Sequence, residues 1–117
     1  KDGNWVPDPF LDDYSMVLKT PKGLVVILGC AHAGVINILN HARESSGEER
    51  VFAVLGGTHL GFSPQDQLNA TIPLLKEANV QVLATSHCTG MGPIARLASE
   101  FQSGFAFGHV GYVLNVA

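Results

Sequence analysis

The sequence predicts an α/β fold for this chain of 117 residues, and three observations support the prediction. Hydrophobic residues make up 46% of the chain and charged residues 15%, so a buried core can form. Short apolar runs of strand length alternate with segments of helical periodicity. Glycines stand between several of these runs and the helices that follow. We therefore expect one unit over residues 1–117, in which helices cover a largely parallel sheet.

The chain is expected to begin with an arm and a hairpin. Residues 1–13 are rich in proline, aspartate and glycine, which is typical of a loop. A turn signal at 21–23 separates two predicted strands, 15–19 and 24–28. Residues 24–28 do not alternate between polar and apolar, which predicts a strand covered on both faces.

Three helices and four more strands are expected after the hairpin. The helices begin near residues 35, 64 and 93, and the first ends before Ser45. Ser63 and Pro64 supply an N-cap and a first helical position for the second helix. Pro73 predicts a kink or a restart within that helix. The remaining predicted strands are 51–55, 80–85, 105–107 and 112–116.

Three histidines, His32, His59 and His87, lie just past the C-terminal ends of strands that lead into helices. Strands joined through helices are usually parallel, so these ends share one edge of the sheet, where open α/β sheets bind ligands. Imidazole is a common ligand of zinc, and three histidines can hold a metal with a water in the remaining position. The sequence therefore predicts a shared site at these three histidines for zinc or a similar divalent ion, one or two in number.

Other polar residues near these histidines allow more than one interpretation. Cys30 and Cys88 could join them in a closed two-cysteine, two-histidine zinc site, but neighbouring residues seldom point the same way, so we favour buried reduced thiols. Thr58 and Thr89 are expected to contact substrate through their hydroxyl groups. The adjacent aspartates at 12 and 13 could form an acid or metal pair, although solvated loop carboxylates are the favoured interpretation.

Composition excludes several classes of partner. A net charge of -3 and scattered basic residues give no reason to expect nucleic acid or an anionic membrane. No stretch approaches the roughly 20 apolar residues of a membrane span. The N-terminus lacks signal-peptide features, so we expect a cytoplasmic protein. Because the sequence starts with Lys rather than Met, we interpret it as a fragment or a trimmed product.

Three segments in order resemble one branch of the metallo-β-lactamase superfamily: 29–34 (GCAHAG), 56–60 (GGTHL) and 87–90 (HCTG). That branch includes metal-dependent hydrolases and the dihydropterin–ribofuranosylaminobenzene-phosphate synthase type. The resemblance implies that the chain is the C-terminal half of an αββα sandwich with metals at one edge. By motif position, His32 resembles the third-motif metal ligand and His87 the final histidine ligand. His59 stands in the region where a bridging aspartate is common.

The superfamily's His-x-His-x-Asp-His signature does not occur in this sequence. The resemblance therefore implies that the catalytic aspartate of that cluster lies outside the chain. We expect a metal-dependent hydrolase that acts on an ester or phosphoester-type bond of a small molecule, once the missing N-terminal half is supplied. The alternative is a non-enzymatic or truncated half-domain that binds metal weakly or not at all and covers its exposed sheet face as a homodimer.

Overall fold

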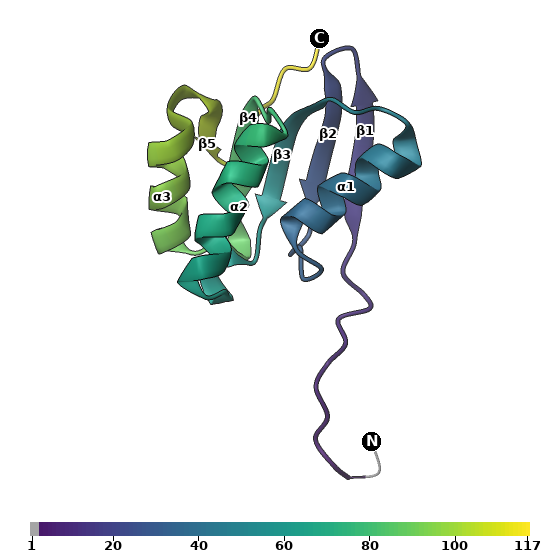
Figure 1. Cartoon of the computed structure of the whole chain (residues 1–117), viewed down its shortest axis with the longest axis vertical. Helices are drawn as coiled ribbons and strands as arrows, with labels where there is room; N and C mark the ends of the chain where they lie inside the picture. Colours follow the sequence, from purple (N-terminus) through teal and green to yellow (C-terminus); the bar gives the residue numbers. More distant parts are fainter. Residues whose placement is uncertain (1–2) are drawn as a thin grey trace.

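Five strands form one mixed sheet whose spatial order follows the chain (Figure 1). The computed structural model describes residues 3–117. The first strand pairs antiparallel with the second, and the other neighbours are parallel. The strands are β1 (Ser15–Thr20), β2 (Gly23–Leu28), β3 (Val51–Gly57), β4 (Val82–Ser86) and β5 (Phe105–Phe107). The predicted hairpin and parallel strands are confirmed, with β4 beginning two residues later than expected.

Three helices cover one face of this sheet (Figure 1). They are α1 (Val35–Ser46), α2 (Gln65–Glu77) and α3 (Met91–Phe101). Because the strand order runs in one direction, right-handed crossovers place all three helices on the same side. The predicted α/β class is confirmed. Pro73 lies inside α2 without ending it, and the helix lacks one hydrogen bond there because proline has no N–H to donate.

The core lies between the helices and one face of the sheet. Alternate residues of β2, which are Leu24, Val26 and Leu28, are buried in it. Val54 and Leu83 continue this face on β3 and β4. Each helix packs its apolar face against this side of the sheet. The helical residues in the same cluster include Leu39, Ala42, Leu68, Ile72, Leu75 and Leu97. The site at the strand ends is therefore supported by a packed layer.

The opposite face of the sheet carries exposed apolar side chains at its β1 edge. Met16 is 59% exposed and pairs in register with Ile27, which is 36% exposed. Leu18, 45% exposed, lies on the same face opposite Val25, which is only 2% exposed. The expectation that β2 is covered on both faces is therefore met at Val25 and not at Ile27. Among residues 3–117, all three helices lie on the other side (Figure 1).

The predicted strand at 112–116 is wrong. Residues 112–117 alternate between half-buried and exposed, as an extended segment would, but they join no strand of the sheet. Gly111, with φ +90°, lies in a turn that takes the chain away from β5. The Lys22 ammonium then donates to the carbonyl of Asn115, which places the C-terminus beside the β1–β2 turn (Figure 1). The sequence pattern over 112–116 correctly indicates an extended conformation, but it does not indicate whether a neighbouring strand is available for pairing.

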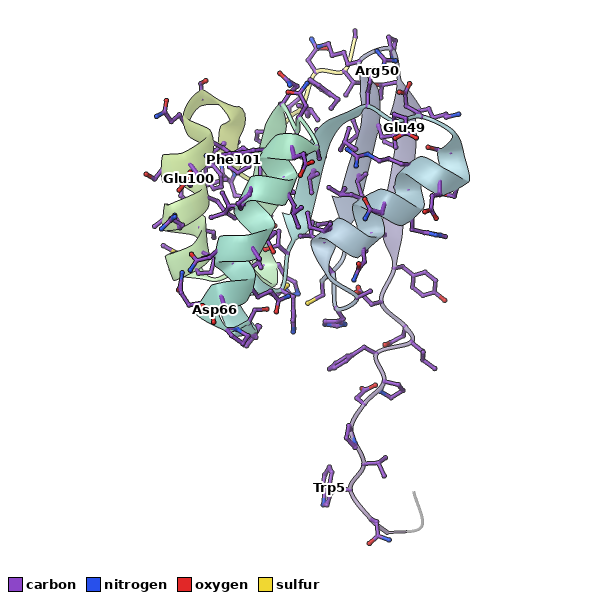
Figure 2. The ribbon with its side chains drawn as sticks, viewed as in Figure 1. Trp5, Glu49, Arg50, Asp66, Glu100 and Phe101 are labelled. Carbon is purple, nitrogen blue, oxygen red and sulfur yellow. The ribbon has the colours of Figure 1, made fainter. Side chains whose placement is uncertain are left out.

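The segment before β1 extends away from the sheet as an arm (Figures 1 and 2). Trp5, near its far end, is fully exposed. The predicted arm covers 1–13, of which residues 1 and 2 lie outside the described residues. None of the helices in the described part of the chain has the length and apolar character that crossing a membrane requires.

Candidate metal site at the strand ends

The C-terminal ends of β2, β3 and β4 meet at one edge of the sheet, as expected from their parallel pairing. His32 lies in the loop after β2. His59 directly precedes the short helix η1 (Leu60–Phe62) after β3, and His87 begins η2 (His87–Thr89) after β4. The three histidines predicted from sequence therefore occupy equivalent places in three successive strand-to-helix connections.

His32 and His59 are in direct contact. Their ring centroids are 4.7 Å apart, and the rings meet edge to face at 87°. Phe10 of the arm lies against His32 at 4.2 Å, and Phe62 lies against His59 at 5.1 Å. Both imidazoles are half-buried. Aromatic neighbours on each side restrict the orientation of the two rings, which favours a fixed pair of nitrogen donors.

His87 approaches the same edge but is exposed. A Cβ atom at Gly57 would lie 3.2 Å from its ring carbon Cδ2 and 2.7 Å from the sulfur of Cys88. Only glycine therefore leaves room for both side chains at the end of β3. His87 has φ +54°, and in this turn its side chain is exposed while that of Cys88 is buried.

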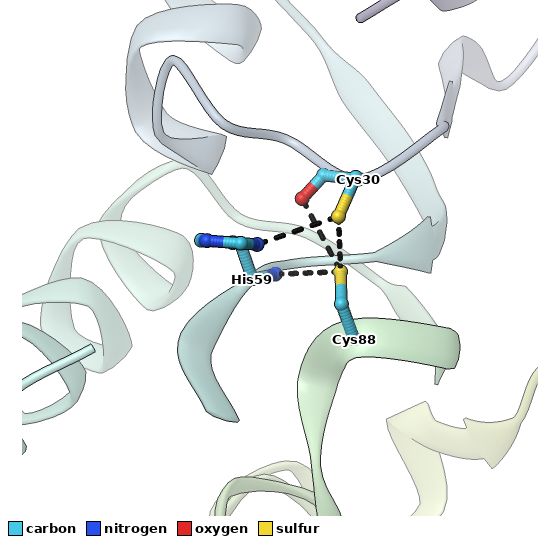
Figure 3. Close-up of side chains that lie close together, drawn as sticks. All are labelled: Cys30, His59 and Cys88. Carbon is cyan, nitrogen blue, oxygen red and sulfur yellow. Dashed lines mark hydrogen bonds between the residues drawn. The ribbon is translucent and has the colours of Figure 1, made fainter. Parts of the chain in front are cut away.

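Cys30, Cys88 and His59 form a close group of metal-ligating side chains (Figure 3). The Cys30 sulfur lies 2.9 Å from the Cys88 sulfur and 3.3 Å from Nδ1 of His59. The backbone N–H of His59 donates to the Cys88 sulfur at 3.3 Å. Burial raises the pKa of the Cys30 thiol to about 12, and the neighbouring Cys88 and the charge of Asp13 add to this effect. Sequence reasoning favoured thiols that take no part in the site, whereas the structure places both among its possible donors.

Asp13 is not the solvated loop carboxylate that the sequence suggested. Its side chain is 11% exposed, and its two oxygens accept the backbone N–H groups of Cys30 at 3.1 Å and His32 at 2.7 Å. Burial raises the pKa of this carboxyl group, but the hydrogen bonds from His32 and Cys30 outweigh it, so the pKa is lowered overall. Asp13 therefore fixes the loop that carries two potential metal donors. Asp12, in contrast, is exposed.

The donors present fit a zinc-class cation. Nδ1 of His32 is buried without a hydrogen-bond partner among residues 3–117, and it lies 3.6 Å from an oxygen of Asp13. A histidine that binds metal through one ring nitrogen usually directs the other toward a carboxylate. Nδ1 of His32 points toward Asp13 without forming a hydrogen bond to it, which would leave Nε2 as the nitrogen for a metal.

Replacing Asp13 with alanine is expected to lower the free energy of unfolding by about 1–3 kcal/mol, because two backbone N–H groups lose their acceptor. Asp12→Ala is the matched control and should change it by less than about 0.5 kcal/mol. The pKa of Asp13 in the folded state lies below its ordinary value of 3.8. Its contribution should therefore be complete above that value and disappear as pH falls through the folded pKa. Urea unfolding at neutral and acidic pH measures both effects, and equal losses in the two variants would contradict this role.

Thr58 and Thr89 are buried, at 3% and 0% exposure. The Thr89 hydroxyl accepts the backbone N–H of Thr58 at 3.2 Å, and the two hydroxyl groups are 3.1 Å apart. These contacts join the loops that follow β3 and β4. The two threonines therefore brace these loops, and the substrate contact predicted from sequence stays a prediction.

Comparisons with known proteins connect this geometry to a family, although no protein-family model matches the chain. Over 114 residues the chain is 32% identical to the 7,8-dihydropterin-6-methyl-4-(beta-D-ribofuranosyl)-aminobenzene-5'-phosphate synthase of Methanocaldococcus jannaschii, covering 97% of this chain and 39% of that protein. It is 30% identical over 116 residues to the uncharacterised protein MJ0448 of the same organism, covering 99% and 41%. The crystal structure of Tm1679, a metal-dependent hydrolase of the β-lactamase superfamily, matches with a TM-score of 0.80. That match has 34% identity over 88% of this chain and 40% of Tm1679.

The chain is a relative of the metallo-β-lactamase superfamily. Its sheet and three helices correspond to half of a metallo-β-lactamase-like fold. The chain spans about two fifths of the length of the relatives it matches. That this part is the C-terminal half stays a prediction. The Cys/His group at the strand ends is a possible metal site in this metallo-β-lactamase relative.

Proposed function

We propose that this chain is the metal-binding half of a metal-dependent hydrolase that cleaves an ester or phosphoester-type bond in a small molecule. The observation that carries the proposal is the contact between His32 and His59 at the ends of parallel strands. The 34% identity to a metal-dependent hydrolase, Tm1679, supports the reaction class. When bound, a zinc-class cation supplies Lewis acidity and lowers the pKa of a coordinated water.

In this proposal His32, His59 and His87 supply imidazole donors from three loops. Asp13 holds the loop of His32 through two backbone hydrogen bonds, and its carboxylate lies 3.6 Å from Nδ1 of the imidazole. Phe10 and Phe62 restrict the motion of the two rings. His87 is exposed, so its side chain would have to turn toward the other two imidazoles to complete the set. Zinc is our choice of metal because imidazole suits it better than it suits magnesium or calcium.

A cavity of about 540 Å³ beside the site supports a small-molecule substrate. It lies between the arm and α1 and is lined in part by Phe10, Asp13, Tyr14 and Asn37. Cavities of roughly 300–1,000 Å³ are typical of small-molecule sites. Asp13 and Phe10 line this cavity and also contact His32, so a substrate held there would lie near the proposed metal.

Hydrolysis of bis(p-nitrophenyl) phosphate and p-nitrophenyl acetate tests the proposal, with Zn²⁺ added. The chain would be assayed alone and with the remaining half of the fold supplied as a separate polypeptide. We expect activity with the supplied half and a loss of about 100-fold or more when His32 and His87 are both replaced by alanine. Glu44→Ala, at an exposed position of α1 outside this cavity, is the control and should keep the rate. A rate that survives in the double variant would exclude the proposed histidine site.

The exposed apolar residues of β1 and β2 favour a second candidate, in which the chain is a non-enzymatic half that covers this face by self-association. Met16, Leu18 and Ile27 share that face. In either case we propose that another layer, the missing half or a second copy, covers these side chains. Sedimentation at micromolar concentration should give a homodimer for the isolated chain, and Met16→Lys should give a monomer. A wild-type monomer would exclude the self-associating candidate.

We further propose a cytoplasmic location, where both thiols would stay reduced.

A further inference from the structure

We propose that Cys30, His59 and Cys88 form a thiolate-rich site for one thiophilic divalent cation of the zinc class. This site shares His59 with the proposed hydrolase but does not depend on hydrolysis. Its three side chains are spaced 29 residues apart along the chain (59 − 30 and 88 − 59). Their donor atoms all lie within 4.8 Å of one another (Figure 3).

The distances between the donors are close to those that a metal would require. In a tetrahedral site with metal–sulfur bonds near 2.3 Å and metal–nitrogen bonds near 2.0–2.1 Å, neighbouring donor atoms lie roughly 3.5–3.8 Å apart. The Cys30 sulfur is 3.3 Å from Nδ1 of His59 and 2.9 Å from the Cys88 sulfur. All three donor atoms lie within 4.8 Å of one another. Shifts of the donor atoms on the order of 1 Å would therefore admit a cation.

The backbone that carries the donors is held in conformations that non-glycine residues seldom adopt. Ala31, His59 and His87 have φ angles of +57°, +58° and +54°, one in each loop at the site edge. Such left-handed residues persist only where the surrounding structure imposes them, and they concentrate at functional sites. Each loop thus turns sharply next to a donor, which directs the two sulfurs and the imidazole toward one point.

The donor set selects the class of cation. Two sulfurs and one imidazole nitrogen suit zinc and softer metals, whereas magnesium and calcium prefer oxygen donors. Two thiolates would also neutralise the charge of a divalent cation. Three protein donors leave one coordination position for another ligand, as in zinc sites that keep an open position. Cys30 is half-buried and Cys88 buried, so bulk water would compete weakly at the sulfurs.

Cobalt absorption tests the assignment, because Co²⁺ replaces Zn²⁺ and gives a sulfur-to-cobalt charge-transfer band only with thiolate ligands. The chain would be reduced with a phosphine, freed of reductant and titrated with Co²⁺. We expect a band that saturates at one equivalent and disappears when Zn²⁺ is added. Cys30→Ser and Cys88→Ser should each remove most of the band, and His59→Ala should weaken cobalt affinity at least about 10-fold.

His41→Ala, an exposed histidine of α1 that belongs to neither proposed donor set, is the matched control and should keep the charge-transfer band. A reduced, folded chain that takes up no cobalt, or cobalt that binds without the band, would overturn the assignment. A third outcome would also overturn it. The chain as isolated would have a mass two hydrogens below that of the dithiol, which identifies a disulfide between Cys30 and Cys88, and after reduction it would take up no cobalt. If the serine variants do not fold, protection of wild-type Cys30 from iodoacetamide by Zn²⁺ provides the test, and unchanged alkylation refutes the site. Loss of hydrolysis with an intact band would count against the proposed function alone.

Discussion

Replacing Gly57 with alanine is expected to lower the free energy of unfolding by about 1–3 kcal/mol and to weaken metal binding at the strand ends. The added Cβ would lie 2.7 Å from the Cys88 sulfur and 2.7 Å from the carbonyl oxygen of Gly29. The second contact is with backbone, which cannot move aside as a side chain can. The ends of β2, β3 and β4 would therefore have to separate. Urea unfolding and Zn²⁺ titration measure the two effects.

Gly92→Ala is the matched control for this substitution. Gly92 lies in α3, and a Cβ there would meet no atom within 4 Å. Alanine favours a helix more than glycine does, but Pro93 directly after it disfavours helical backbone at a residue with a Cβ, so the two effects oppose each other and the net change should be less than about 1 kcal/mol. If Gly57→Ala behaves like Gly92→Ala in both measurements, the close approach of the three loops is not a feature of the folded chain.

Replacing Leu83 with alanine is expected to have the largest effect on stability, about 2–5 kcal/mol. Leu83, the second residue of β4, is fully buried in the cluster that joins the sheet to the helices. Removing its side chain leaves a cavity beneath the strand that carries the Cys88 turn. Because domains of this size are stable by only about 5–15 kcal/mol, this change removes a large fraction of the stability of the fold.

Leu11→Ala provides the same chemical change at a site that is 84% exposed in the arm. It should change the free energy of unfolding by less than about 0.5 kcal/mol. Thermal unfolding of the two variants, monitored by circular dichroism, compares them directly. A loss at Leu83 no larger than that at Leu11 would mean that the sheet and helices do not pack as the structure shows.

Much of the fold follows from local patterns in the sequence. The apolar runs at β2, β3 and β4 and the helical periodicity after each of them determine a parallel sheet, and right-handed crossovers then place every helix on one face. The segment 112–116 shows the limit of this reasoning. Alternation predicts an extended conformation, but a strand also needs a neighbour, and pairing depends on contacts far away in the sequence.

The site was predictable in position but not in composition. Strand ends identified His32 and His59 as neighbours. The adjacent side chains of His87 and Cys88 point in different directions, as expected for neighbours, but the sequence does not indicate which of the two faces inward. The left-handed turn at His87 leaves its side chain exposed while Cys88 is buried. The sequence does not predict the role of Asp13, because its carboxylate oxygens accept backbone N–H groups 17 and 19 residues away, and such distant hydrogen bonds produce no local sequence pattern.

Anomalous diffraction at the zinc absorption edge, from crystals of the chain grown with Zn²⁺, tests the central claim most directly. The account predicts a single strong peak at the edge formed by the ends of β2, β3 and β4, about 2.0–2.3 Å from the donor atom of His59 and from at least one other histidine or cysteine donor there. A zinc ion bound elsewhere on the chain, with His32, His59 and Cys88 left without metal, would contradict it.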